Sequence, residues 1–188
     1  MSKLATTADL VQLVNWLDFQ EYLDLDHDSY RVELRDGVIK QVPPPRPVHM
    51  RVQMQLLRIL RPVEAMGFCV DKEFPYRPAL NFQFWVADIA VLPVSVMSLL
   101  ATWKQYEVFA PPLIVEVLSP SNRESKLARQ RMISMSNGTL EFWIVDADAQ
   151  QIQVSTLHGV RLYDNTESIV LAAVPGVEIK VSEVFNLS

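Results

Sequence analysis

The spacing of apolar residues predicts a chain in which strands and helices alternate. Apolar residues at every second position are typical of strands, and apolar residues at every third or fourth position are typical of helices. Read in this way, the middle of the chain has the order α-β-β-β-α-β. The predicted helices cover residues 48–66 and 122–136, and the predicted strands cover residues 69–77, 82–93, 113–119 and 141–148.

The N-terminal part of the chain adds two elements to this order. Residues 6–23 carry apolar residues at roughly helical spacing, which predicts a peripheral helix. Asp36 and Gly37 then separate two extended runs. Because glycine tolerates a positive φ, this pair predicts a tight β-hairpin over residues 31–42.

The pattern is weaker in three other places. Pro62 interrupts the helix predicted over residues 48–66, so we expect a kink there. Residues 95–110 have no regular spacing and predict an irregular segment. Residues 152–158 predict a hairpin with the preceding strand, and residues 174–185 predict an edge strand followed by a short terminal turn.

The composition is that of one globular domain. The chain has 188 residues, of which 49% are hydrophobic and 21% are charged, which is too apolar for a disordered chain. We therefore expect one α/β domain over residues 1–188. Its predicted parts are an N-terminal helix and hairpin (1–46), a core (47–146) and a C-terminal β extension (147–188).

Charge and cysteine content narrow the possible classes of protein. The net charge of −5 argues against a surface that is basic throughout, although a local basic face stays compatible with it. The single cysteine, Cys69, excludes an intrachain disulfide framework and favours a buried thiol. The N-terminus has no signal-peptide pattern, and no apolar run reaches the length of a membrane span, so we expect a cytoplasmic protein.

Two acidic residues lie in strands that are otherwise apolar. Side chains alternate between the faces of a strand, and both faces of residues 113–119 are apolar except at Glu116. Asp88 repeats this pattern within residues 82–93. An ionised carboxylate in a dry interior is costly unless a partner neutralises or coordinates it. Both residues therefore need a partner.

A divalent cation is one partner that would allow the two carboxylates to lie close together. Two unpaired carboxylates about 4 Å apart repel each other by about 4 kcal/mol at an effective dielectric constant of about 20. Mg²⁺ or Mn²⁺ reverses that sign, and Mg²⁺ typically binds one or two protein carboxylates. Asp88 and Glu116 fit this pattern. The alternative is that each acid forms a buried ion pair with an arginine or lysine.

Five segments, taken in order, resemble a known family. They are VELRDG, PPPRPVH, VADIAVLP, LIVEVLSPSN and EFWIVD, and they span about Tyr30 to Val154. Together with the order α-β-β-β-α-β they resemble the PD-(D/E)XK nuclease superfamily, and more closely its putative restriction endonuclease family, known mainly as a domain of unknown function. The resemblance implies a restriction-endonuclease-like fold, with a central mixed sheet flanked by helices and extra β-hairpins.

The resemblance also implies roles for individual residues. Asp88 matches the aspartate of the PD element and Glu116 matches the acid of the (D/E)XK element, which implies that both bind a metal ion. The backbone carbonyl of Val117 is a further implied ligand. Glu33 matches an acidic hairpin position that could complete the metal site, and His49 matches a histidine that could contact phosphate or the metal's waters.

The sequence departs from the family pattern at two points that bear on catalysis. Leu118 stands where the superfamily's lysine is expected, and Gln130 stands where a lysine is often supplied from the following helix. Lys126 lies four residues before Gln130, so the two side chains share a helical face and the lysine could substitute. Lys126 would then assist the attacking water, and Gln130 would orient it.

Two basic sets favour a nucleic-acid partner, although the solvated faces of amphipathic helices would have the same appearance. They consist of Arg123, Lys126, Arg129 and Arg131, and of Arg51, Arg58 and Arg61.

The sequence therefore predicts an endonuclease, dependent on Mg²⁺ or Mn²⁺, that hydrolyses DNA and acts as a homodimer. The alternative is a catalytically inactive module with the same fold that binds nucleic acid or protein.

Overall fold

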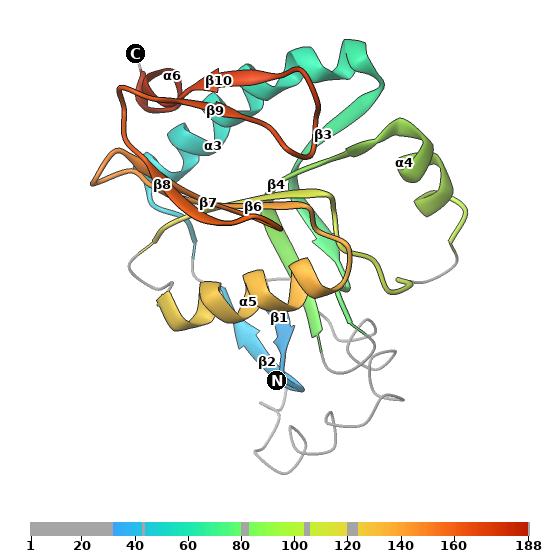
Figure 1. Ribbon diagram of the computed structural model, residues 1–188. Helices are drawn as coiled ribbons and strands as arrows, with labels where there is room; N and C mark the ends of the chain where they lie inside the picture. The colour runs from blue at the N-terminus through green and yellow to red at the C-terminus, as the bar shows by residue number, and fades with distance from the viewer. Residues whose placement is uncertain (1–31, 43, 80–82, 104–105, 120–123, 188) are drawn as a thin grey trace.

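The computed structural model arranges the chain in layers around one large β-sheet (Figure 1). The helix predicted over residues 6–23 lies outside the described part of the chain. The residues that the structure describes are 32–42, 44–79, 83–103, 106–119 and 124–187.

Eight strands of the described chain form the main sheet. They are β1 (Val32–Arg35), β2 (Val38–Gln41), β3 (Phe68–Tyr76), β4 (Gln83–Pro93), β5 (Leu113–Val117), β6 (Glu141–Asp146), β7 (Gln151–Thr156) and β8 (Gly159–Tyr163). Their order is β2-β1-β4-β5-β6-β7-β8, and β3 also pairs with β4. Strands β5 and β6 are parallel, whereas the other described pairs are antiparallel. Parallel neighbours need a crossover connection, and a helix provides it here.

Helices cover both faces of this sheet (Figure 1). The remaining elements are α3 (Pro47–Leu60), a 3₁₀ helix (Arg61–Met66), α4 (Val94–Leu100), α5 (Glu124–Ser136), β9 (Ser168–Val170), β10 (Glu178–Lys180) and α6 (Val181–Phe185). On one face lie α3, α6 and the small sheet of β9 and β10. On the other face lies α5, the crossover helix between β5 and β6.

Strand β5 separates two apolar cores. Leu113, Val115 and Val117 are fully buried in the larger core, which contains the buried face of α3 and residues of the C-terminal segment. Ile114 packs in the smaller core, against which partly buried residues of α5 pack. The two faces of β5 are therefore both apolar, as the sequence predicts, and Glu116 follows Ile114 on the face directed toward α5.

Several predictions are confirmed. The fold is a mixed α/β arrangement with a central, mostly antiparallel sheet and flanking helices. Asp36 and Gly37 form the predicted hairpin turn between β1 and β2, with φ values of 51° and 75°. A positive φ at both central residues is the geometry that favours Asp-Gly in a tight hairpin. The hairpin predicted from residues 152–158 is the β6–β7 pair.

Two predictions about helices are wrong. The α-helix expected over residues 48–66 ends at Leu60, and Pro62 lies in the 3₁₀ helix that follows. The proline ring and its missing N–H disfavour a continued α-helix, so the α-helix gives way to a 3₁₀ helix there. Residues 95–110, expected to be irregular, include most of the short helix α4.

The C-terminal segment also differs from expectation. Strand β10 does not join the edge of the main sheet but pairs with β9 in a separate sheet, and the terminal turn is the short helix α6. Strand β8 has no counterpart in the sequence prediction. Cys69, expected in the core, is only partly buried. None of the described helices is long and apolar enough to cross a membrane.

Candidate active site

Asp88 and Glu116 lie close together at the end of the β4–β5 ladder. The last pair of that antiparallel ladder is Ile89 and Val115, and Asp88 and Glu116 are the next residue of each strand beyond it. The charge of Asp88 acts on Glu116 and raises its pKa. Asp88 is 6% and Glu116 is 5% exposed, so two acids meet in the interior.

Asp88 is held by both its strand neighbour and helix α3. Its Oδ2 accepts a hydrogen bond from the backbone N–H of Val117 at 2.8 Å. Its Oδ1 accepts one from Gln53 Nε2 at 2.7 Å and lies 3.2 Å from His49 Nε2. His49 and Gln53 are four residues apart and therefore share one face of α3. The helix thus fixes the carboxylate from above the sheet.

Glu116 is held from the opposite side by helix α5. Its Oε1 accepts a hydrogen bond from Gln130 Nε2 at 2.8 Å. Gln130 Nε2 also lies 3.2 Å from the Tyr76 hydroxyl, which in turn lies 3.2 Å from Ser134 Oγ. The two acids therefore have separate supports, one built from α3 and one from α5 and β3.

Glu33 brings a third buried carboxylate to the same place. It lies on β1, is 3% exposed, and its Oε1 accepts a hydrogen bond from the backbone N–H of Val86 at 3.2 Å. Its Oε2 accepts one from Arg35 Nε at 2.7 Å and contacts a terminal nitrogen of the same guanidinium. Both oxygens of Glu33 are thus engaged by the chain itself.

The electrostatics of this cluster disfavour the ionised form of Glu116. Burial raises the pKa of Glu116 well above its ordinary value, and the charges of Asp88 and Glu33 raise it further. Arg35 and Lys126 oppose this shift. Lys126 is partly buried, and burial, followed by the charge of Arg35, lowers its pKa, while the three carboxylates act to raise it. Five charged groups thus interact around one small volume.

Three polar atoms beside the acid pair are buried without a hydrogen-bond partner in the described part of the chain. They are His49 Nδ1, Gln53 Oε1 and Gln130 Oε1. Buried polar groups normally have a partner in the protein, a water or an ion, so these three atoms are open to a water or an ion. No group of three or more His, Cys, Asp or Glu side chains among the described residues could hold a metal ion by itself. A cation would therefore depend on the two acids, backbone or amide oxygens, and water.

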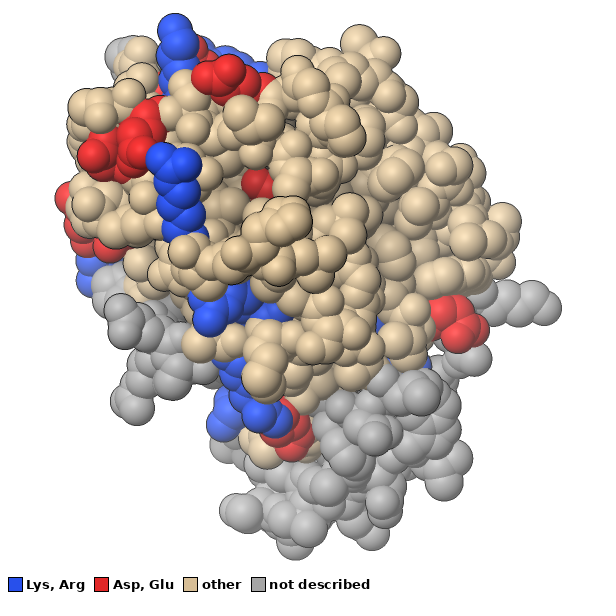
Figure 2. Space-filling model, viewed as in Figure 1, with Lys and Arg blue, Asp and Glu red and all other residues tan. Residues whose placement is uncertain are grey.

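A clasp joins the β1–β2 turn to α5 near this site. Arg129 Nε donates to Asp36 Oδ2 at 2.8 Å, and Gln83 Nε2 donates to Asp36 Oδ1 at 2.7 Å. Figure 2 shows lysine and arginine side chains over α5 and the hairpin below it, whereas much of the rest of this face is uncharged. The surface over α5 and the hairpin therefore carries several basic side chains, although the whole chain is acidic.

The chain has clear similarity to known proteins. Residues 19–182 match the family model Uma2, which is described as "Putative restriction endonuclease". The chain belongs to the Uma2 family. Among solved structures it is similar to a putative nuclease of the DUF820 family from Anabaena variabilis, with a TM-score of 0.77 and 20% sequence identity over 89% of this chain and 97% of that one. No curated protein matches the chain.

The structure of this Uma2 member brings together most of the residues that the sequence singled out. Asp88, Glu116 and Glu33 form the acid cluster, and His49 contacts Asp88. Gln130, at the position expected for a helix lysine, contacts Glu116 directly. The metal roles of these residues, and that of the Val117 carbonyl, stay predictions. The contact seen for Val117 is made by its N–H, which donates to Asp88.

The basic residues do not form one surface. Arg129 belongs to the clasp, whereas Arg131 lies 3.4 Å from Ser155 Oγ. Arg51, Arg58 and Arg61 line a separate groove on α3 together with methionine and leucine side chains. Arg123 lies outside the described residues. The α5 set therefore flanks the acid cluster only in part.

Sequence reasoning missed four residues of the site. Arg35 follows Glu33 by two positions on a strand and Gln53 follows His49 by four on a helix, so both could have been found from spacing. Tyr76 and Ser134 gave no such signal, because strand β3 and helix α5 are brought together only by the tertiary fold. The ion-pair alternative was raised for Asp88 and Glu116, whereas the ion pair seen beside them joins Glu33 to Arg35.

Proposed function

We propose that this Uma2 member is a metal-dependent endonuclease that hydrolyses phosphodiester bonds in DNA. The observation that carries the proposal is the convergence of Asp88 and Glu116 in the interior, with the charge of Glu33 added to theirs. Such a cluster opposes ionisation unless a cation occupies it, and strongly perturbed carboxyl groups of this kind are typical of functional sites.

The donors around the acid pair fit Mg²⁺ or Mn²⁺. Asp88 and Glu116 would hold the ion, with the Val117 carbonyl and Glu33 as further candidates. The unpartnered Gln53 Oε1 supplies another hard oxygen beside Asp88, of the type that these ions prefer. When bound, the ion supplies an activated water and offsets the charge that develops on phosphate.

The other residues have roles that follow from their positions. Lys126, whose pKa burial lowers, can release its proton more readily than an exposed lysine, and in its charged form it can neutralise charge on phosphate. Gln130 holds Glu116 through its amide N–H. His49 and Gln53 hold Asp88 from α3, and His49 Nδ1 has no hydrogen-bond partner among the described residues.

DNA is the substrate that best suits the local charge. The charges of Glu33, Asp88 and Glu116 act on Lys126, and the same helix carries Arg129, which pairs with Asp36. Figure 2 shows lysine and arginine side chains over α5 and the β1–β2 hairpin. Phosphate contacts by such residues position a nucleic acid without reading its sequence. A chain with a net charge of −5 can bind DNA only through a local surface of this kind.

A plasmid-nicking assay tests the proposal. Supercoiled plasmid should be nicked in the presence of Mg²⁺ or Mn²⁺ and not with EDTA. Glu116→Gln, which keeps the shape but removes the charge, should lower the rate by at least about 100-fold, since two or more acids must be ionised to hold the ion. The matched control is Glu178→Gln, the same change at an exposed residue of β10, and it should leave the rate unchanged.

The same assay decides against the catalytically inactive alternative. That alternative has one observation in its favour, because the neutral Gln130 stands at the expected lysine position. A protein that retards DNA in a gel but never cleaves it with Mg²⁺ or Mn²⁺ is a binding module. Cleavage that persists at full rate in Glu116→Gln would come from a contaminant and would reject the assignment of this site.

A further inference from the structure

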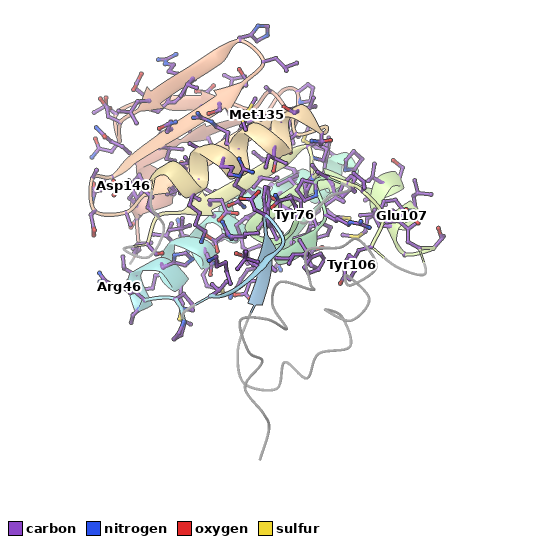
Figure 3. All side chains as sticks on the ribbon, turned by 90° about the horizontal axis from the view of Figure 1, so that it is seen from below. Arg46, Tyr76, Tyr106, Glu107, Met135 and Asp146 are labelled. Carbon is purple, nitrogen blue, oxygen red and sulfur yellow. The ribbon has the colours of Figure 1, made fainter. Side chains whose placement is uncertain are left out.

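A chain of buried polar side chains runs from Glu116 into the interior beneath α5. Gln130 Nε2 donates to Glu116 Oε1 at 2.8 Å and to the Tyr76 hydroxyl at 3.2 Å. The Tyr76 hydroxyl lies 3.2 Å from Ser134 Oγ. Gln130, Tyr76 and Ser134 are each at most 1% exposed. Figure 3, in which Tyr76 is labelled, shows this residue near the middle of the molecule.

The two hydrogen bonds made by Gln130 fix the direction of its carboxamide. A primary amide has two N–H donors at one end and a carbonyl acceptor at the other. With both donors directed to Glu116 and Tyr76, the carbonyl oxygen must face elsewhere. Gln130 Oε1 is buried and has no hydrogen-bond partner among the residues that the structure describes. It is therefore an acceptor presented to something that the chain itself does not supply.

Tyr76 is suited to accept the second N–H of Gln130. Burial, followed by the charge of Glu116, raises the pKa of Tyr76, so the phenol keeps its proton. A neutral phenol that donates to Ser134 Oγ keeps its lone pairs for the Gln130 N–H. Ser134 lies one helical turn after Gln130, on the same face of α5. Helix α5 thus provides both residues that contact the Tyr76 hydroxyl, Gln130 and Ser134.

We propose that Tyr76 and Ser134 are positioning residues, which lock the Gln130 amide so that its carbonyl oxygen accepts a hydrogen bond from a water molecule held at the Asp88–Glu116 pair. This inference rests on the proposed function, since that function places water at the acid pair. Without the tyrosine hydroxyl the amide loses one of the two contacts that fix it, and only the contact with Glu116 remains. The carbonyl oxygen is then less firmly directed toward the water.

Calorimetric titration of the full chain with Mn²⁺ tests the proposal. Tyr76→Phe should weaken Mn²⁺ binding by about 10-fold, the lower end of the effect of removing a group that orients a metal ligand. Ser134→Ala should weaken it less, in the same direction. Tyr163→Phe removes a hydroxyl from β8, at the far end of the sheet order, and should leave the affinity unchanged.

A double mutant separates positioning from a general structural effect. Gln130→Met keeps the volume of the side chain but has no amide to orient. In that background Tyr76→Phe should change Mn²⁺ affinity no further, because the two residues act as one unit. Equal losses in both backgrounds, or no loss in either, would overturn the inference. If Tyr76→Phe does not fold, the same pair of backgrounds with Ser134→Ala decides the question.

An NMR measurement gives a second readout that does not depend on metal. The two side-chain N–H protons of Gln130, identified by their loss in Gln130→Met, should both exchange slowly with solvent in the wild type. In Tyr76→Phe one of them should exchange faster while the backbone amides of α5 keep their protection. Unchanged exchange of both protons would overturn the inference.

The two proposals fail in different ways. Wild-type protein that does not bind Mn²⁺, or binds it as well after Glu116→Gln, rejects the proposed function together with the inference. Binding that Glu116→Gln abolishes and that Tyr76→Phe leaves unchanged rejects only the role of Tyr76.

Discussion

Two neighbouring strands each bury a glutamate, and the two sites differ in what surrounds the carboxylate. Glu141, on β6, is fully buried, and each of its oxygens has its own donor. Oε1 accepts the indole N–H of Trp143 at 2.7 Å, and Oε2 accepts the backbone N–H of Ala173 at 3.0 Å. The carboxylate therefore ties β6 to the C-terminal segment, and each of its oxygens has a hydrogen-bond donor.

Glu116, on β5, has different surroundings. Gln130 donates to one of its oxygens, and its other close neighbours include two more carboxylates. Burial and the charges of Asp88 and Glu33 raise its pKa well above the ordinary range. Nearby, Gln53 and Gln130 each keep a buried carbonyl oxygen without a partner among the described residues.

The comparison distinguishes a buried acid that stabilises the fold, Glu141, from a buried acid of the candidate site, Glu116. A buried carboxylate by itself indicates neither, because both glutamates are buried to nearly the same degree. What distinguishes them is whether the fold supplies donors for the charge, as at Glu141, or gathers more negative charge around it, as at Glu116. The second arrangement disfavours the ionised carboxylate, which either takes up a proton or needs a cation to compensate its charge.

The largest expected effect is on stability at Glu141. Glu141→Ala leaves the Trp143 indole and the Ala173 amide without an acceptor, and each buried donor left unpaired costs about 1–3 kcal/mol. We expect a loss of about 2–5 kcal/mol in the free energy of unfolding, measured with urea in EDTA. Glu116→Ala should cost clearly less, since it also removes repulsion. Equal losses of unfolding free energy in Glu141→Ala and Glu116→Ala would contradict this distinction between the two acids.

A smaller effect concerns pH. Because burial and its acidic neighbours raise the pKa of Glu116, the folded protein binds a proton more tightly there than the unfolded chain does. This contribution to stability is full below the unfolded pKa, near 4.5, and is lost as pH rises through the folded pKa. Metal-free Glu116→Gln should therefore become more stable than wild type as pH rises, by on the order of 1 kcal/mol near neutrality.

Urea unfolding at several pH values in EDTA provides the measurement. The difference between wild type and Glu116→Gln should shrink as pH falls toward 4.5. The reference pair is wild type and Glu178→Gln, at an exposed position, and their difference should not vary in this way. A stability gap at Glu116 that is constant with pH would show that the carboxyl group titrates normally.

The sequence was sufficient where the signal is local. The Asp36-Gly37 turn follows from backbone preferences of two residues, and Asp88 and Glu116 stand out because their strands are otherwise apolar. That the two side chains lie close together could be anticipated only through the family resemblance. Gln130 was found through its place in the helix, although its contacts with Glu116 and Tyr76 were not.

Long-range packing accounts for what the sequence did not predict. Glu141 begins a predicted strand and looks like an ordinary strand-end acid, since Ala173, which supplies one donor, is 32 residues away. In the sequence Tyr76 looks like an ordinary strand residue, because its contact with Ser134 of α5 forms only in the folded protein. The separate sheet of β9 and β10 depends on the C-terminal segment folding back over α3, which no local spacing encodes.

The most direct test of the central claim is thermal unfolding of the protein with and without Mn²⁺. A ligand that binds only the folded state at 100 times its dissociation constant stabilises it by about 2.7 kcal/mol. Wild type should therefore melt several degrees higher with Mn²⁺ than with EDTA, whereas Asp88→Asn and Glu116→Gln should melt at the same temperature in both. A melting temperature that Mn²⁺ leaves unchanged in wild type, or raises equally in all three proteins, would contradict the claim that these two acids form a cation site.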